Sequence, residues 1–200
     1  MVNAKIIIIF EESFTMKRFA IILMSLFLAV SMSAQEHMTF EGLEIKGFSR
    51  NFIHNLRSVK FKQQKSGAIE GKHLGEKCEL YLVVTPKTDK VYMVAVAYPI
   101  CPSWQLLKTR YESMKSKLIV RYGLPSVESE SFLPPYTEED GINAVVKKGC
   151  AYISTFVTDA GEISISISED ARVYIFYTDK AGSLQSQEEI LPDLGIYNGQ

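Results

Sequence analysis

The sequence has few cysteines and histidines, and it has no recognisable arrangement of catalytic groups. Only three residues of each type occur among 200, and no Cys-x-x-Cys pair is present. The histidines, His37, His54 and His73, fall on different predicted elements without the spacing of zinc ligands. We also find no Ser-His-Asp context, no glycine-rich phosphate loop and no pair of carboxylates on one predicted face. The pattern predicts neither a metal nor a cofactor, and it favours a non-enzymatic protein.

An excess of positive charge is also missing. The chain has 22 basic and 23 acidic residues, which gives a formal net charge of −1. Proteins that hold nucleic-acid backbones usually show a basic balance, so we expect no nucleic-acid partner. The apolar share of 46% and the charged share of 22% are typical of a globular protein. A length of 200 residues favours a single domain.

A continuous apolar run lies near the N-terminus, from Phe19 to Val30. Two basic residues precede the run and small residues follow it, as in a secretory signal peptide. We therefore predict a signal peptide at 16–34, cleaved after Ala34 or after Ser33. The alternative is an uncleaved anchor, but a spanning helix needs about 20 apolar residues and this run is shorter. After cleavage we expect no stable membrane span.

Residues 1–15 precede a signal peptide that is already complete. We interpret them as an upstream extension from a start codon assigned too early, with Met16 as the true start. Residues 35–200 are then the mature protein, which we expect to be a single domain. Its predicted location is the periplasm or the extracellular space, where disulfides persist.

Apolar periodicity predicts two helices and two groups of strands in the mature chain. The clearer helix covers 103–122, with Ser103 as its N-cap and Gly123 at its end. A shorter helix is predicted after Phe48, with Ser49 as its N-cap. The predicted strands cover 68–74, 77–84, 91–98, 142–146, 151–157, 162–168 and 172–178. We interpret 126–141 as an acidic connector, and the chain from about 181 as a polar tail with a few apolar anchors.

These elements predict an α+β fold. Short loops between successive strands indicate antiparallel pairing, and helices that each precede a run of strands favour α+β over α/β. We expect a curved antiparallel sheet with two helices packed on one face, in the order α-βββ-α-ββββ. In the strand at 162–168, isoleucine alternates with serine, so we expect the serines on the solvent side.

The three cysteines carry two separate predictions, one for Cys78 with Cys150 and one for Cys101. Cys78 and Cys150 each begin an apolar strand, and we predict a disulfide between them because export permits one. Cys101 precedes the helix at 103–122, and a thiol at a helix N-terminus can have a lowered pKa. A reactive Cys101 is therefore a hypothesis, and a packed or disulfide-bonded cysteine is the ordinary alternative.

The long helix carries many basic residues. Its cations could face an anionic partner such as lipid headgroups or acidic glycans, although a charged outer face is the usual property of an amphipathic helix. The candidate residues are Lys108, Arg110, Lys115, Lys117 and Arg121.

Several segments resemble a group of uncharacterised secreted proteins common in Bacteroidetes. The segments are FEGLEIKG, KCELYLVV, RYGLPS, KKGCAYISTF and RVYIFYTDK, which together extend over nearly the whole mature chain. A helix followed by Tyr-Gly, proline and strands is also similar to the small modules of β-lactamase-inhibitor-like proteins and outer-membrane-assembly lipoproteins. This chain lacks the lipidated cysteine of the lipoproteins. Both resemblances imply a secreted α+β protein, and neither supplies a catalytic residue.

The sequence therefore favours an exported, non-enzymatic binding or interaction protein. Its expected partner is an envelope or extracellular protein or glycan. The alternative is a small secreted hydrolase or thiol-dependent enzyme whose site forms around Cys101.

Overall fold

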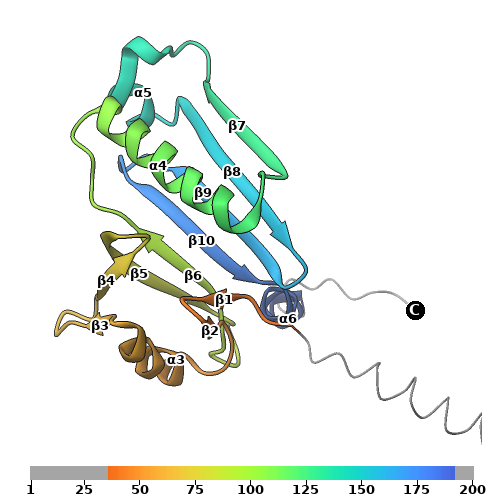
Figure 1. Cartoon of the computed structure of the whole chain (residues 1–200). Coiled ribbons are helices and arrows are strands. Elements are labelled where there is room, and N and C mark those ends of the chain that lie inside the picture. Colours follow the sequence, from red (N-terminus) through yellow and green to blue (C-terminus); the bar gives the residue numbers. More distant parts are fainter. Residues whose placement is uncertain (1–35, 192–200) are drawn as a thin grey trace, which may run out of the picture. The chain divides into compact units, whose positions relative to one another are not determined.

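The computed structural model describes residues 36–191. The predicted upstream extension, the predicted signal peptide and the tail residues Leu194, Ile196 and Tyr197 lie outside the described residues. The described part is a mixed α+β structure with a large antiparallel sheet and four α-helices (Figure 1). No helix within residues 36–191 combines the length and the apolar character that a membrane span requires.

The first half of the described chain begins with a small hairpin. Its strands are β1 (Thr39–Phe40) and β2 (Leu43–Glu44), with Gly42 at φ 81° in the turn. The hairpin is followed by α3 (Ser49–Leu56), a 3-10 turn (Arg57–Val59), β3 (Lys62–Gln63), β4 (Ile69–His73), β5 (Glu76–Val84) and β6 (Val91–Ala97).

The second half begins with the long helix α4 (Trp104–Tyr122). It continues through β7 (Val127–Phe132), a 3-10 turn (Glu138–Asp140), α5 (Gly141–Val146), β8 (Cys150–Thr158), β9 (Gly161–Ile167), β10 (Val173–Asp179) and α6 (Lys180–Ile190). The large sheet has the order β3-β4-β5-β6-β10-β9-β8-β7, with every neighbouring pair antiparallel. Each half thus contributes four strands that follow a helix, and the halves join through their last strands, β6 and β10.

The predicted long helix is confirmed at both ends. The Ser103 hydroxyl accepts a hydrogen bond from the Leu106 N–H at 3.4 Å, and Gly123 ends the helix at φ 82°. Four residues spaced by three and four are buried: Leu107, Tyr111, Met114 and Leu118. They pack α4 onto one face of β8, β9 and β10 (Figure 1).

The alternation predicted for 162–168 is also found. Ile163, Ile165 and Ile167 of β9 are buried in the core, and the serines between them are half-buried. Ile163 and Ile165 pair directly with Phe156 and Ser154 of β8, so these four residues share one face of the sheet. The Ser154 hydroxyl contacts the Tyr111 hydroxyl of α4 at 2.8 Å, which shows that α4 covers this face.

Several predicted elements are wrong, and the element order differs from α-βββ-α-ββββ. Residues 142–146 form helix α5 rather than a strand, and the connector at 126–141 contains strand β7. The tail from 181 forms most of α6. Ser49 does not cap α3: its hydroxyl donates to Asp89 at 2.8 Å, and Phe48 occupies the N-cap position. That two helices share one face of a curved sheet stays a prediction.

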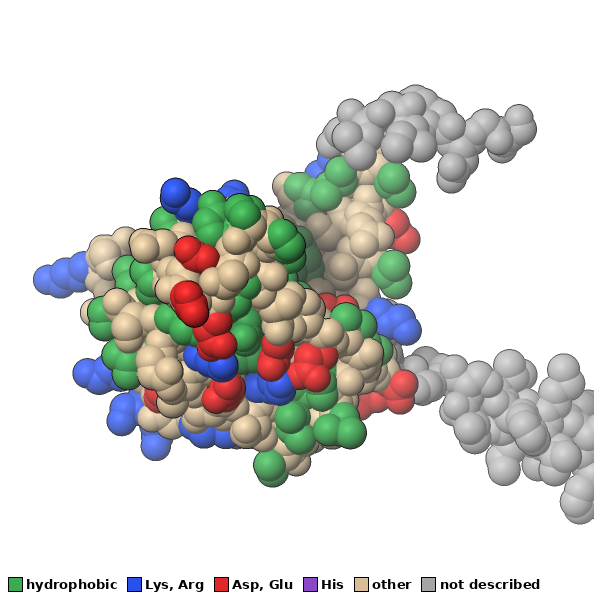
Figure 2. All heavy atoms as spheres, turned by 90° about the horizontal axis from the view of Figure 1, so that it is seen from above, with side chains coloured by type: hydrophobic (Ala, Val, Ile, Leu, Met, Phe, Trp, Pro, Cys, Tyr) green, Lys and Arg blue, Asp and Glu red, His purple; other side chains and the backbone are tan. Residues whose placement is uncertain are grey.

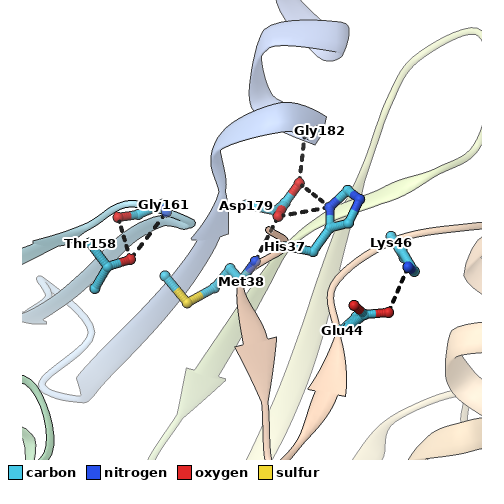
Figure 3. A network of polar contacts seen from close by, with 8 residues as sticks. All are labelled: His37, Met38, Glu44, Lys46, Thr158, Gly161, Asp179 and Gly182. Atoms are coloured by element: carbon cyan, nitrogen blue, oxygen red, sulfur yellow. Dashed lines mark hydrogen bonds and ion pairs between the residues drawn. The ribbon is translucent and has the colours of Figure 1, made fainter. Parts of the chain in front are cut away.

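A buried carboxylate fixes the start of the described chain to the end of the sheet. Asp179, the last residue of β10, accepts hydrogen bonds from the N–H groups of Met38 and Gly182, both at 2.8 Å (Figure 3). His37 Nδ1 lies 3.1 Å from each oxygen of the same carboxylate. Asp179 therefore caps α6 and also holds the segment that leads into β1.

Candidate functional site

The hairpin β4–β5 places two lysines directly opposite each other. Leu74 and Gly75 form its two-residue loop, both with positive φ (49° and 91°), which suits a tight hairpin turn. The loop pairs His73 with Glu76 and Lys72 with Lys77. Like charges directly opposite on one face of a sheet destabilise it. The fold therefore retains an electrostatically unfavourable pair, Lys72 and Lys77, on this hairpin.

A glycine in β4 allows the preceding segment to pack closely. A Cβ atom on Gly71 would lie 2.3 Å from the ring of Phe61, which is buried. The absence of that atom lets Phe61 pack against β4. Phe61 lies between Lys60 and Lys62, so its position brings both lysines to the same part of the molecule as Lys72.

These four lysines surround a hollow of about 950 Å³. We call it the cationic hollow and define it by Lys60, Lys62, Lys72 and Lys77. Within residues 36–191, none of the four ammonium groups has an ion-pair or hydrogen-bond partner. Apolar groups, including Val59, also contribute to the wall, with Ala97, Pro99 and Ile100 from β6 and the segment after it.

The acidic side chains of the hollow already have partners. Glu79 accepts a hydrogen bond from Arg172 at 3.3 Å, and Glu70 accepts one from Gln64 Nε2 at 2.8 Å. Glu41 lies 2.5 Å from His73 Nδ1. The four lysines therefore outnumber the three carboxylates, and each carboxylate already has a partner at or beside the wall of the hollow.

A buried histidine holds Glu41 at the wall of the hollow. Burial lowers the pKa of His73, although the neighbouring Glu41 acts in the opposite direction. The lowered pKa favours the neutral ring. Because a carboxylate only accepts hydrogen bonds, the neutral ring would donate from Nδ1 to Glu41. His73 Nε2 then accepts a hydrogen bond from the Tyr177 hydroxyl at 2.9 Å. Because His73 and Tyr177 are both buried, this chain of contacts positions Glu41 and offers no accessible nucleophile.

A second, smaller hollow of about 480 Å³ shares Glu41 and Lys72 with the first. Helix α4 adds Lys117 and Arg121 to its wall. The Lys117 ammonium donates a hydrogen bond to the Leu74 carbonyl at 2.8 Å, beneath the β4–β5 turn. The two hollows together extend the basic surface from β3 to the end of α4.

The cationic face predicted on α4 is divided by the structure. Lys108 binds Glu138 at 2.7 Å, and Arg110 binds Glu76 at 3.1 Å. Lys115 binds both Glu128 and Glu130, which raises the pKa of its ammonium group. Figure 2 shows red and blue side chains next to one another over the end of the molecule that is uppermost in Figure 1. Of the five predicted cations, Lys117 and Arg121 line the smaller of these two hollows, and the other three line neither.

The setting of Cys101 favours the protonated thiol. Cys101 is buried, and burial raises its pKa, whereas the nearby Arg110 guanidinium acts in the opposite direction. Arg110 donates to the Cys101 sulfur at 2.8 Å and to the Pro99 carbonyl at 2.6 Å. A nucleophilic cysteine needs a lowered pKa and access to substrate. This environment therefore gives little support to a thiol-dependent site.

The predicted disulfide between Cys78 and Cys150 is wrong, because all three cysteines are free. Cys78 lies on β5 and Cys150 on β8, and three strands separate them in the sheet. Four strand spacings amount to about 19 Å, whereas a disulfide requires Cα atoms within about 7 Å. Burial raises the pKa of Cys78 to about 12 and that of Cys150 to about 11.

Among the described residues, no group of three or more His, Cys, Asp or Glu side chains is arranged to hold a metal ion. Comparison of the chain with protein-family models, curated proteins and solved structures found no match. The candidate site therefore rests on the geometry and the charges of the cationic hollow.

Sequence reasoning missed all four lysines of the cationic hollow. They lie on or beside short strands, where isolated lysines look like ordinary solvated residues. One signal was present in the sequence: the Leu74-Gly75 pair suits a two-residue hairpin loop, which would have set Lys72 opposite Lys77. The approach of Lys60 and Lys62 depends on the packing of Phe61 against Gly71, which no local pattern indicates.

Proposed function

We propose that this protein is an exported, non-enzymatic binding module that holds an acidic oligosaccharide in the cationic hollow. The observation that carries the proposal is the group of four unpaired lysines around one hollow whose carboxylates already have partners. An anionic ligand would relieve the repulsion between Lys72 and Lys77. The formal net charge of the chain is only −1, so long-range repulsion of an anion by the whole protein is small.

The size and the walls of the hollow support a small ligand. Sites for small molecules usually enclose about 300–1,000 Å³, and the hollow falls within this range. Lysine provides mobile point charges rather than the rigid fork of arginine, which suits carboxylates spaced along a flexible sugar chain. The apolar groups of Ala97, Pro99 and Ile100 provide a surface for the apolar faces of sugar rings.

The proposal is tested by titrating the protein with a galacturonic acid tetrasaccharide in a calorimeter. The double substitution of Lys72→Gln and Lys77→Gln should weaken binding about tenfold, which corresponds to about 1.4 kcal/mol. Added salt should weaken binding to the unmodified protein, because the lysines are exposed. The thermal midpoint of the double variant should not fall, because a like-charge pair has been removed.

A matched control removes two charges outside the hollow. Lys108 and Lys148 each pair with a glutamate, and replacing both with glutamine changes the net charge by the same amount. This variant should bind the tetrasaccharide as tightly as the unmodified protein. An equal loss of binding in both variants, or equally tight binding of a neutral galactose tetrasaccharide, would contradict the proposal.

Export of the protein is the second part of the proposal, and the sequence of residues 16–34 supports it. N-terminal sequencing of the protein isolated from its native cells should begin at Ala34 or Gln35. A chain that begins at Met1 or Met16 in the cell envelope or the medium would show that no signal peptide is removed.

An enzyme built around Cys101 is the weaker alternative. The raised pKa and the burial of this thiol are unfavourable for a nucleophile. Labelling with a thiol reagent distinguishes the two functions, because an active-site cysteine should react much faster at neutral pH than an unfolded control peptide does.

A further inference from the structure

Strand β7 forms one edge of the large sheet, and only β8 pairs with it among the described strands. It is six residues long, and most of its residues are exposed. The opposite edge is β3, which has only two residues. An exposed edge strand is a template for pairing with another chain, and proteins usually shorten or charge such edges. The length of β7 therefore makes it the edge that could accept a further strand.

The register shows which backbone groups of β7 face outward. Leu133 donates its N–H to the Gly149 carbonyl at 2.9 Å, and this pair continues the register that sets Ser129 opposite Ile153. Inward and outward orientation alternate along an antiparallel strand. The N–H and C=O groups of Glu128, Glu130 and Phe132 therefore point away from β8, toward the open edge.

One face of this edge is acidic. Glu128 and Glu130 lie on the face that α4 covers, and both carboxylates bind the single ammonium group of Lys115. Two carboxylates and one ammonium leave an excess of one negative charge beside the outward backbone groups. Both glutamates remain partly exposed to solvent, so a second cation could reach them.

The other face of the edge is apolar. Val127 of β7 is 60% exposed, and Ile153 and Val157 of the neighbouring β8 are 40% and 64% exposed. These residues lie on the face opposite the glutamates, because side chains alternate along each strand. A strand added to β7 would therefore meet acidic groups on one side and apolar groups on the other.

A second copy of this protein is a poor occupant of the edge. Pairing β7 with β7 of another copy would bring Glu128 and Glu130 of both chains together on one face. Like charges on neighbouring strands are unfavourable. The glutamates thus act against self-association and favour a segment of opposite charge.

From this geometry we infer that β7 is a docking edge for an extended segment of another protein, in which basic residues alternate with apolar ones. The segment adds a ninth strand to the sheet through the outward backbone groups of β7. Its basic side chains lie beside Glu128 and Glu130, and its apolar side chains extend the exposed surface of Val127, Ile153 and Val157. This edge is separate from the cationic hollow, which lies near the opposite edge of the sheet, at β3 to β5. The proposed peptide binding at β7 and the proposed oligosaccharide binding in the hollow can therefore be tested independently.

The test uses the whole protein and an octapeptide of alternating lysine and valine, with a glutamate-valine octapeptide as the control. Binding of the lysine peptide should slow amide hydrogen exchange at Glu128, Glu130 and Phe132, measured by NMR. It should leave the amides of Lys62 and Gln63 at the other edge unchanged. Slower exchange at other amides only, or equal binding of the glutamate peptide, would overturn the inference.

Substitutions separate the backbone contribution from the charge. Proline is tolerated on an edge strand where the N–H faces solvent, so Glu130→Pro should keep the hydrogen bonds between β7 and β8. It should weaken binding of the lysine-valine peptide about tenfold, because a backbone hydrogen bond to the peptide is lost. Glu130→Gln keeps the amide and removes the charge, and it should weaken binding less and reduce its dependence on salt. Gln63→Pro at the opposite edge is the matched control and should bind normally.

Two outcomes of these substitutions would contradict docking at β7. One is unchanged binding by a folded Glu130→Pro protein, and the other is an equal loss in the Gln63→Pro control. If Glu130→Pro fails to fold, the exchange measurement on the unmodified protein and the salt dependence of Glu130→Gln still decide the question.

Discussion

Replacing Asp179 with alanine is expected to lower the free energy of unfolding by about 3 kcal/mol, because the carboxylate is buried and serves three partners. It accepts hydrogen bonds from the N–H groups of Met38 and Gly182 at 2.8 Å and contacts His37 at 3.1 Å (Figure 3). Loss of a buried partner costs about 1–3 kcal/mol and loss of a helix cap about 1 kcal/mol.

Chemical denaturation followed by circular dichroism measures this change. The matched control is Asp159→Ala, since Asp159 is exposed and its removal should alter stability by less than about 0.5 kcal/mol. Asp179→Asn should fall between the two, because the amide retains one acceptor oxygen. A loss as small as that of the control would show that the first strand and α6 do not depend on this carboxylate.

Replacing Leu107 with alanine should lower the free energy of unfolding by about 2–5 kcal/mol, the range for emptying a buried leucine site. Leu107 is fully buried between α4 and the sheet, in the same stripe as Tyr111 and Met114. The Tyr111 hydroxyl in the same stripe contacts the Ser154 hydroxyl of β8 at 2.8 Å. Denaturant melts of the variant measure the loss.

The neighbouring residue provides the control for this prediction. Leu106 lies on the same helix and is 55% exposed. Leu106→Ala makes the same chemical change at the surface and should alter stability by less than about 0.5 kcal/mol. Similar losses at both positions would mean that helix propensity, rather than burial against the sheet, determines the effect.

The charges of the candidate site show why composition alone is a weak guide to a binding surface. The basic residues of α4 were the most visible cations in the sequence, yet Lys108, Arg110 and Lys115 have acidic partners in the fold. The unpaired lysines come instead from the β3–β5 region and the turn before it, far from α4 in the sequence. Whether a cation is free depends on which acids the tertiary structure brings to it.

Errors in the predicted elements have similar causes. The acidic composition of Val127–Phe132 predicts a connector, but in the structure Glu128 and Glu130 face the same side of β7 and bind Lys115 of α4. The alternation of charged and uncharged residues is visible in the sequence. The sequence does not show that Lys115 of α4 pairs with the two glutamates. Residues 142–146 are apolar and β-branched in part, yet Ala144 and Val145 are buried within a short helix.

The sequence by itself determined the features that depend on a few neighbouring residues. These are the caps and the buried stripe of α4, the alternation of Ile163, Ile165 and Ile167, and most strands of the large sheet. Each follows from local backbone geometry and from the period of the side chains. Only the tertiary structure decided the order of the strands, which places β6 beside β10 and keeps Cys78 far from Cys150. It also decided which lysines stay unpaired and which sheet edge stays open, because these depend on contacts between residues that are distant in the chain.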